Sequence, residues 1–488
     1  MSRSPLTFLP KGKKVVGMAI GAMAMLAVAV PAWSQEVFGV TTLIQVPSAE
    51  SNTAGTLFSF DISWVDPGLQ RYFLADRNNK AIDVISTDNP NNGVIAQFFA
   101  PFAGFTGNND TSGPNGVLAL LQTAQQGGGT ELWIGDSNTN CASPPCDGST
   151  PAKTPGSGRV WIMDAVTGAI LPPSPILVGG NTRADELCFD PINRVIMIAS
   201  PSENFVTFIS TGTAAIAKGT ILGQLSFDGG ADAGHVLATN GIEQCGWSPF
   251  THLFYQNIPA SNGTDGKDDV PGVVAVISPT TRTVMGKPFV IPIDAFAGCA
   301  GPQGMAMGPN NQILLGCNAA SPLTPPGPRN SVIIDAITGT VLQVLANLGG
   351  ADQVWFNPGN GRYIIPSCNT PCRTVPGNGP TGPELLGIVN SNGFNVDQLV
   401  TVAVQNGDTN VTSGNPRTAH SVAADPETHA IFLPVPACNP PTGCGNVPHF
   451  TPTICDLFDP STIVRVGNPS TAKGCIAVLT TAVVTPTP

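Results

Sequence analysis

The apolar and polar positions of this chain form short runs that recur at a regular spacing. A short apolar run leads into a turn with proline, and a second apolar run follows, as in Asp185-Glu-Leu-Cys-Phe-Asp-Pro and then Val195-Ile-Met-Ile-Ala. Six copies end on the turn prolines Pro67, Pro191, Pro249, Pro309, Pro358 and Pro426. Short apolar runs bounded by turn residues indicate β-strands. Each copy therefore predicts a strand, a turn and a second strand.

A seventh, degenerate copy fills the gap between the first two. It consists of Asn115-Gly-Val-Leu-Ala-Leu-Leu and then Glu131-Leu-Trp-Ile-Gly. A third apolar run, such as Arg159-Val-Trp-Ile-Met-Asp, and a weaker fourth, such as Thr340-Val-Leu-Gln-Val-Leu, complete the repeat. Four short strands in a repeat of about 60 residues are typical of a propeller blade. We therefore expect an all-β fold in which residues 35–488 form a single seven-bladed β-propeller with four antiparallel strands per blade.

The seventh blade is incomplete in chain order, because its third strand, Cys475-Ile-Ala-Val-Leu, lies near the C-terminus. We expect Val37 to Val46 to supply its fourth strand, with Ala482 to Thr485 as the alternative. Either arrangement closes the ring and leaves no exposed edge between the first and last blades.

Long loops are expected on one face of the propeller. The connections between second and third strands are long in five blades, at 136–158, 257–271, 318–330, 367–383 and 436–473. In a propeller these connections emerge where each innermost strand begins. Long loops on a rigid scaffold are a usual place for a binding site.

The first 34 residues have the pattern of an export signal. Four basic residues precede an apolar run from Val15 to Val30, and Ala32-Trp33-Ser34 supplies small residues for cleavage. An uncleaved anchor is the alternative, although the run is short for a membrane span. We expect residues 1–34 to be a signal peptide. The mature protein is then periplasmic or extracellular and has no membrane span.

Charge and cysteine content agree with export. The formal net charge of −11 becomes about −15 without the four basic leader residues, which disfavours nucleic acid as a partner. Twelve cysteines, an even number, predict disulfides. The expected pairs are Cys141/Cys146, Cys368/Cys372, Cys438/Cys444, Cys299/Cys317 and Cys455/Cys475, which leaves Cys188 and Cys245 in neighbouring repeats, one position out of register. The spacings suit neither haem attachment nor a zinc site.

A ring of polar residues is expected at the mouth of the central channel. The residue six places before each turn proline should begin an innermost strand, and around the ring it is Asp61, Asn115, Asp185, Glu243, Gln303, Asp352 and His420. Oxygen ligands in this number suit Ca²⁺, with Asp61, Asn115, Asp185, Glu243 and Asp352 as the candidate ligands. A wet polar channel without metal is the alternative. A shift of one residue would instead direct Glu186 or Gln353 inward.

The repeat resembles a known type of exported propeller. The Asp-Pro turn, the aliphatic strand and the turns Asp164-Ala-Val-Thr-Gly and Asp335-Ala-Ile-Thr-Gly are similar to YVTN/NHL-type repeats. The resemblance covers nearly the whole mature chain. It implies the fold and says little about activity.

A second, partial resemblance is to the gluconolactonase, regucalcin and paraoxonase propellers. Gly113-Pro-Asn115-Gly-Val looks like their calcium-binding Asn motif, whereas their Glu-Gly-Pro opening is missing and the gluconolactonases have six blades. The resemblance implies a Ca²⁺-dependent lactone or ester hydrolase, with Glu243, His420 and Asp185 as catalytic residues.

Two functions follow from these observations. We expect an exported propeller that binds a small molecule, a metal ion or an exported protein partner through its loop-rich face and polar axial channel. The lactone or ester hydrolase at the channel mouth is the alternative.

Overall fold

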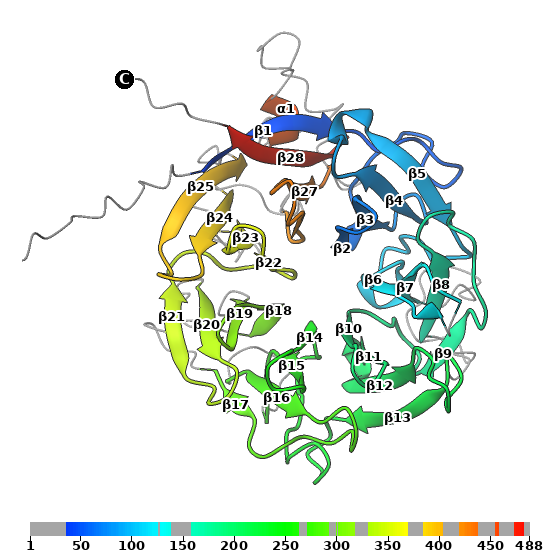
Figure 1. The fold of residues 1–488 in the computed structure, drawn as a ribbon, viewed down its shortest axis with the longest axis vertical. Coiled ribbons are helices and arrows are strands. Elements are labelled where there is room, and N and C mark those ends of the chain that lie inside the picture. The colour runs from blue at the N-terminus through cyan, green and yellow to red at the C-terminus, as the bar shows by residue number, and fades with distance from the viewer. Residues whose placement is uncertain are drawn as a thin grey trace, which may run out of the picture. The chain divides into compact units, whose positions relative to one another are not determined.

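The computed structural model describes residues 36–124, 127–137, 158–262, 271–291, 299, 301–317, 330–368, 384–403, 419–437, 454–457 and 473–482. Within the unit Glu36–Pro488 they form seven four-stranded antiparallel sheets. Figure 1 shows these sheets as blades around a common centre. The predicted all-β, seven-bladed propeller is confirmed.

The strands follow one another outward from the centre in each blade. Blade 1 is β2 (Phe60–Asp66), β3 (Arg71–Asp76), β4 (Ala81–Ser86) and β5 (Val94–Phe99); blade 2 is β6 (Val117–Leu121), β7 (Thr130–Asp136), β8 (Gly158–Asp164) and β9 (Ile176–Gly179); blade 3 is β10 (Leu187–Asp190), β11 (Val195–Ser200), β12 (Phe205–Ser210) and β13 (Ile221–Ser226). Blade 4 is β14 (Cys245–Trp247), β15 (Phe254–Ile258), β16 (Val273–Ile277) and β17 (Phe289–Val290); blade 5 is β18 (Pro302–Met307), β19 (Gln312–Cys317), β20 (Ser331–Asp335) and β21 (Val341–Leu345). Blade 6 is β22 (Trp355–Asn357), β23 (Arg362–Cys368), β24 (Glu384–Asn390) and β25 (Val396–Ala403); blade 7 is β26 (Ala423–Ala424), β27 (Ile431–Val435), β28 (Cys475–Ala482) and β1 (Val37–Ile44). A short helix, α1 (Ile454–Leu457), and 3₁₀ turns at Pro90–Asn92, Asn109–Thr111 and Pro201–Glu203 lie between strands.

The innermost strands form a closed series. Each of them contacts the innermost strand of the next blade, in the order β2, β6, β10, β14, β18, β22 and β26, and β26 contacts β2 again. The ring is therefore complete without a missing blade.

The sequence of the repeat explains its turns. In the Asp-Pro turn of blade 3, Asp190 Oδ1 accepts hydrogen bonds from the amides of Ile192 (2.8 Å) and Asn193 (3.1 Å). Asp side chains favour such turns because they satisfy amides that would otherwise lack a partner. The Asp-Ala-x-Thr-Gly turns join third and fourth strands in the same way, and their glycines, Gly168 (φ 74°) and Gly339 (φ 71°), adopt the left-handed conformation.

The N-terminal strand closes the ring, as expected. β1 pairs antiparallel with β28, from Val37 opposite Ala482 to Ile44 opposite Ile476. The side chain of Gln398 on β25 also binds both backbone groups of Phe38, at 2.8 and 2.7 Å. The first and last segments of the propeller thereby share one blade, and that blade is tied to blade 6.

The five long connections do join second and third strands, as their positions between β7 and β8, β15 and β16, β19 and β20, β23 and β24, and β27 and β28 show. Most of their length lies outside the described residues. The disulfides expected for Cys141/Cys146, Cys368/Cys372 and Cys438/Cys444 fall there too. Ligand binding by these loops stays a prediction.

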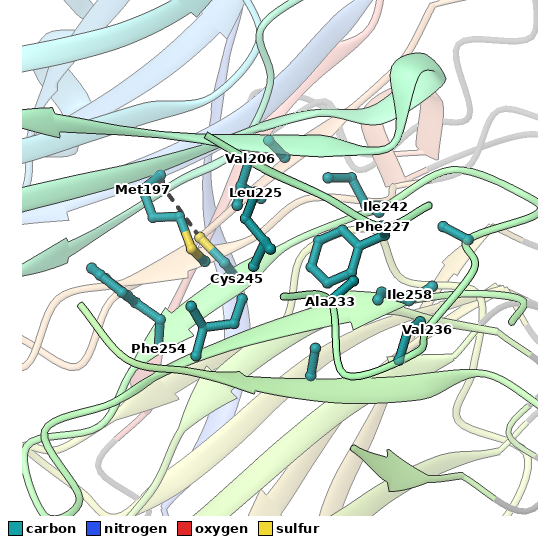
Figure 2. Packing of buried hydrophobic residues seen from close by; sticks show 14 of the residues in the cluster. Met197, Val206, Leu225, Phe227, Ala233, Val236, Ile242, Cys245, Phe254 and Ile258 are labelled. Atoms are coloured by element: carbon teal, nitrogen blue, oxygen red, sulfur yellow. Dashed lines mark hydrogen bonds between the residues drawn. The ribbon is translucent and has the colours of Figure 1, made fainter. Parts of the chain in front are cut away.

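Apolar side chains fill the space between adjacent blades. Between blades 3 and 4, Met197, Val206, Leu225 and Phe227 face Ile242, Cys245, Phe254 and Ile258, with Ala233 and Val236 from the intervening loop (Figure 2). A disulfide joins Cys188 and Cys245 across this interface, with a Cα–Cα distance of 5.7 Å. Both sulfurs lie 3.7 Å from the carbonyl oxygen of Met197.

Two further disulfides were also expected and are present, Cys299–Cys317 and Cys455–Cys475. Disulfides are typical of proteins that fold in an oxidising compartment. In the described part of the chain, no helix has the length and apolar character needed to span a membrane.

Removing the interblade disulfide is expected to destabilise the propeller. Cys188 and Cys245 are 57 residues apart, so the double substitution to alanine should lower the free energy of unfolding by about 2–4 kcal/mol. The matched control removes Cys299–Cys317, whose separation is 18, and should cost about 1 kcal/mol less because its loop is shorter. Urea unfolding under oxidising conditions measures both. An equal or reversed order would contradict a loop-closure origin of the stability.

Candidate functional site

A β-bulge lies at the start of the innermost strand in five blades. In blade 3, the amide of Asp185 donates to Ala199 O (2.9 Å) and the amide of Ala199 donates to Glu186 O (3.0 Å). Asp185 and Glu186 therefore both lie opposite the single residue Ala199, which is the pattern of a β-bulge. Equivalent bulges occur at residues 61–62, 115–116, 243–244 and 303–304. The position six residues before the turn proline is therefore the first bulge residue in these blades, not the beginning of a regular strand. Bulges re-aim side chains, which places adjacent residues at one site.

Side chains from several blades converge near these bulges. The charge of Asp352 in blade 6 acts on Glu243 in blade 4, and the charges of Asp185 and Asp61 act on Glu243 as well. We call the group the axial cluster; it comprises Asp61, Arg77, Asn115, Arg183, Asp185, Glu186, Glu243, Asp352 and His420, and Gln303 holds the equivalent bulge position of the backbone in blade 5.

Arg77 occupies the part of the axial cluster that belongs to blades 1 and 2. It lies in the turn between β3 and β4, and its Nη2 donates to Asp61 Oδ2. The same guanidinium donates to Asn115 Oδ1 from Nη2 (2.7 Å) and from Nε (3.1 Å). Asn115 in turn donates to Ala184 O at 3.0 Å. Two of the expected metal ligands are therefore held by a guanidinium.

Arg183 forms ion pairs with carboxylates of the axial cluster beside blade 3, as Arg77 does in blade 1. Its Nη2 lies 2.8 Å from Asp185 Oδ2 and its Nη1 lies 3.5 Å from Asp61 Oδ2. The arginine and both carboxylates are buried. Although burial disfavours its charge, Asp185 and Asp61 raise the pKa of Arg183 above its usual value. Asp61, Arg77, Asn115, Arg183 and Asp185 form the arginine-paired half of the axial cluster.

The other half of the axial cluster is open. Glu243, Asp352 and His420, which we call the open arc, belong to blades 4, 6 and 7 and are each partly exposed. Among the described residues, no cationic group lies within 4 Å of the carboxylate of Glu243 or Asp352 outside this arc. The ring of His420 stacks on Phe60 at 4.7 Å between centroids. The two acidic residues of the axial cluster with partial exposure, Glu243 and Asp352, therefore both belong to the open arc.

Burial raises the pKa of four carboxyl groups in the axial cluster, those of Asp185, Glu186, Glu243 and Asp352. Burial, opposed by Arg183, raises the pKa of Asp185 to about 7. Burial and the charges of Asp185 and Glu243 raise the pKa of Glu186 well above its usual value. Burial and the charge of Asp352 do the same to Glu243, and burial raises the pKa of Asp352 itself. The axial cluster therefore holds protons that exposed carboxyl groups would have lost.

The one-residue ambiguity in the predicted ring has different outcomes in blades 3 and 6. Glu186 joins Asp185 in the axial cluster. Gln353 instead accepts from the amide and hydroxyl of Ser63 (both 3.1 Å) and donates to Ser63 O (2.6 Å), so it ties blade 6 to blade 1. Gln353 is a structural residue.

The pattern of the repeat did not predict that Arg77 and Arg183 lie in the axial cluster. Arg77 stands in a turn and Arg183 in a loop, outside the periodic strands on which the ring was aligned. The one available signal was the position of Arg183, two residues before Asp185.

The arginine-paired half does not fit a calcium ion, because its oxygens already face guanidinium groups. In the described ranges, no group of three or more His, Cys, Asp or Glu side chains is placed to hold a metal. Calcium at the axial cluster stays a prediction. The catalytic roles of Glu243, His420 and Asp185 stay predictions of the sequence resemblance as well; all three lie in the axial cluster.

Comparisons with known proteins do not identify a family. No family model matches the chain, and no curated protein matches it. A chain of a solved structure described as "Crystal Structure of Mitotic Checkpoint Complex" has 14% sequence identity and a TM-score of 0.46, with 86% of this chain and 95% of that chain covered. The propeller fold of this protein is shown by its own seven sheets.

Proposed function

We propose that the protein is an exported binding propeller that takes a small polar ligand at the open arc of its axial cluster. The single observation that carries the proposal is the asymmetry of the cluster. Arg77 and Arg183 form ion pairs with Asp61 and Asp185 in one half, whereas Glu243 and Asp352 in the other half are partly exposed and, among the described residues, feel the arginine charges only from beyond 4 Å.

Carboxyl groups with a raised pKa, such as those of Glu243 and Asp352, are frequent at functional sites. The rigid ring of blades holds these side chains in place, which lowers the entropy that a ligand must lose on binding. Export is supported by the three disulfides and by the basic and apolar pattern of residues 1–34.

Replacing Glu243 with glutamine is expected to weaken ligand binding at least about tenfold, because one carboxyl oxygen becomes an amide NH₂ group, which cannot accept a hydrogen bond. The probes are 1,4-butanediol, 4-amino-1-butanol, 4-hydroxybutyrate and calcium chloride, and the readout is the increase in melting temperature with probe concentration. The matched control is Glu427→Gln, in the exposed turn between β26 and β27. Equal shifts for wild type and Glu243→Gln would overturn the proposed site.

A further inference from the structure

Blades 1 and 6 bind each other directly across the innermost strand of blade 7. The side-chain amide of Gln353 pairs with the backbone of Ser63 on β2, because its Oε1 accepts from the amide of Ser63 (3.1 Å) and its Nε2 donates to Ser63 O (2.6 Å). Trp64 on β2 and Trp355 on β22 also meet edge to face, with 5.4 Å between ring centroids. These contacts pass β26, which has only the two residues Ala423–Ala424. We call them the axial closure.

Blade 7 is bound into the axial closure on both of its sides. The amide of Val422 donates to Gln353 Oε1 (3.3 Å), and the amide of Gln353 donates to His420 O (2.9 Å). On the side of blade 1, the hydroxyl of Ser421 donates to Asp61 O (2.7 Å). None of these hydrogen bonds involves a residue that precedes Asp61 in the chain. The axial closure is therefore made without the N-terminal strand.

The N-terminal strand closes the ring a second time, at the rim, where β1 lies on the outer side of β28 (Figure 1). The side-chain amide of Gln398 binds both backbone groups of Phe38, at 2.8 and 2.7 Å. The carboxylate of Glu36 lies 2.6 Å from Arg362 Nη1 and 3.1 Å from His429 Nδ1. We call these contacts, together with the pairing of β1 on β28, the rim closure. Blade 6 thus contributes a glutamine to each closure.

The two closures differ in burial. Gln353 and Ser63 of the axial closure are 1% and 0% exposed. In the rim closure, the side chains of Glu36 and His429 are 29% and 25% exposed, and Val37 is 42% exposed. β1 is also an edge strand of its sheet. Segments with little buried surface open locally at a lower free energy than segments in the core.

We infer that the two closures open independently, so that β1 is a strap that docks on a ring already held shut by the axial closure. The place of β1 in the chain suits this role, because β1 follows the predicted leader, residues 1–34, closely. The axial ring then forms without waiting for the N-terminus to be released. The backbone of Asp61 and His420 is bound by residues of the axial closure, so both keep their places in the axial cluster when β1 leaves. This inference does not depend on the proposed ligand.

Hydrogen exchange of the full chain, followed by mass spectrometry of peptides from β1 and β2, tests the inference. Gln398→Leu removes both bonds to Phe38, so it should speed exchange of β1 about tenfold or more and leave β2 unchanged. Gln353→Leu should do the opposite, with faster exchange of β2 and no change in β1. Ser63→Ala removes a single hydroxyl and should give a smaller increase at β2, which keeps the test available if Gln353→Leu does not fold.

The matched control is Gln343→Leu. Gln343 lies on β21, the outermost strand of blade 5, as Gln398 lies on that of blade 6, and its side chain donates to the neighbouring Val344 O (3.0 Å). Exchange of β1 and β2 should be unchanged in this variant. Faster exchange of both strands in either Gln398→Leu or Gln353→Leu would overturn the inference, because the closures would then open as one unit. Unchanged exchange of β1 in Gln398→Leu would overturn it as well.

Discussion

Replacing Arg183 with methionine is expected to lower the free energy of unfolding by about 3–5 kcal/mol. Arg183 is 8% exposed and lies within ion-pair distance of Asp185 and Asp61. Methionine removes the guanidinium and leaves the buried carboxylate of Asp185 without its ion-pair partner, whereas Asp61 keeps Arg77; removing one partner is the costly way to break a buried ion pair. Urea unfolding followed by tryptophan fluorescence measures the change.

Two further variants isolate this effect. Adding Asp185→Asn to Arg183→Met removes one uncompensated carboxylate, so the double variant should regain part of the lost stability, and a double-mutant cycle quantifies the coupling. Lys287→Met replaces an exposed cation and should change stability by less than about 0.5 kcal/mol. A loss below about 1 kcal/mol for Arg183→Met would show that the carboxyl groups are neutralised by protons alone.

The second large effect is a fall in stability as the pH rises from about 4.5 to 7.5. The pKa is raised by burial to about 7 for Asp185, to about 6 for Asp136 and to about 6 for Asp83, whereas the usual value of 3.8 applies in the unfolded chain. Between the two values the folded protein binds protons that the unfolded chain has lost. Unfolding then releases protons, and the free energy of unfolding decreases by about 1.4 kcal/mol per pH unit for each of them.

The direction of this effect is opposite to that of proteins whose carboxyl groups are stabilised in their charged form. The bound protons contribute fully to stability below the pKa of the unfolded chain, and this contribution is lost as the pH rises through the raised pKa of the folded protein. Urea midpoints measured from pH 4.5 to 8 give the slope. Asp185→Asn should flatten it by up to about one proton, whereas Glu427→Gln should not. Stability that increases with pH over this interval would contradict the raised pKa values.

Local chemistry is the reason that so much of the fold could be predicted. The Asp-Pro turn works through hydrogen bonds from amides two and three residues away, so its place is readable in Asp190-Pro-Ile-Asn without knowledge of any distant contact. The strand that closes the ring was predictable because one blade lacked a strand in chain order. Cys188 and Cys245 were only the two cysteines that the expected pairs left over. They form a disulfide because neighbouring repeats become neighbouring blades, and their offset of one position does not matter since the two strands belong to different sheets.

The axial cluster was predictable only in outline. Counting back from the proline found Asp61, Asp185 and Glu243, but not the bulge that adds Glu186 beside Asp185. A bulge depends on which residues of two strands face each other, and the apolar pattern does not report it. The arginines were missed because Arg77 reaches Asn115 from another blade, and such a contact exists only when the ring has closed.

The sequence by itself determined the number of blades, the strand order and the turns, because these depend on short-range hydrogen bonding and on the order of the repeats. Only the tertiary structure decided which ring carboxylates are neutralised. Asp61 and Asp185 meet Arg183 within 3.5 Å, whereas Glu243 and Asp352 meet no guanidinium at that range among the described residues. Electrostatic energy in a buried site depends on distances of a few ångströms between side chains from different blades, and those distances are set by the closed ring.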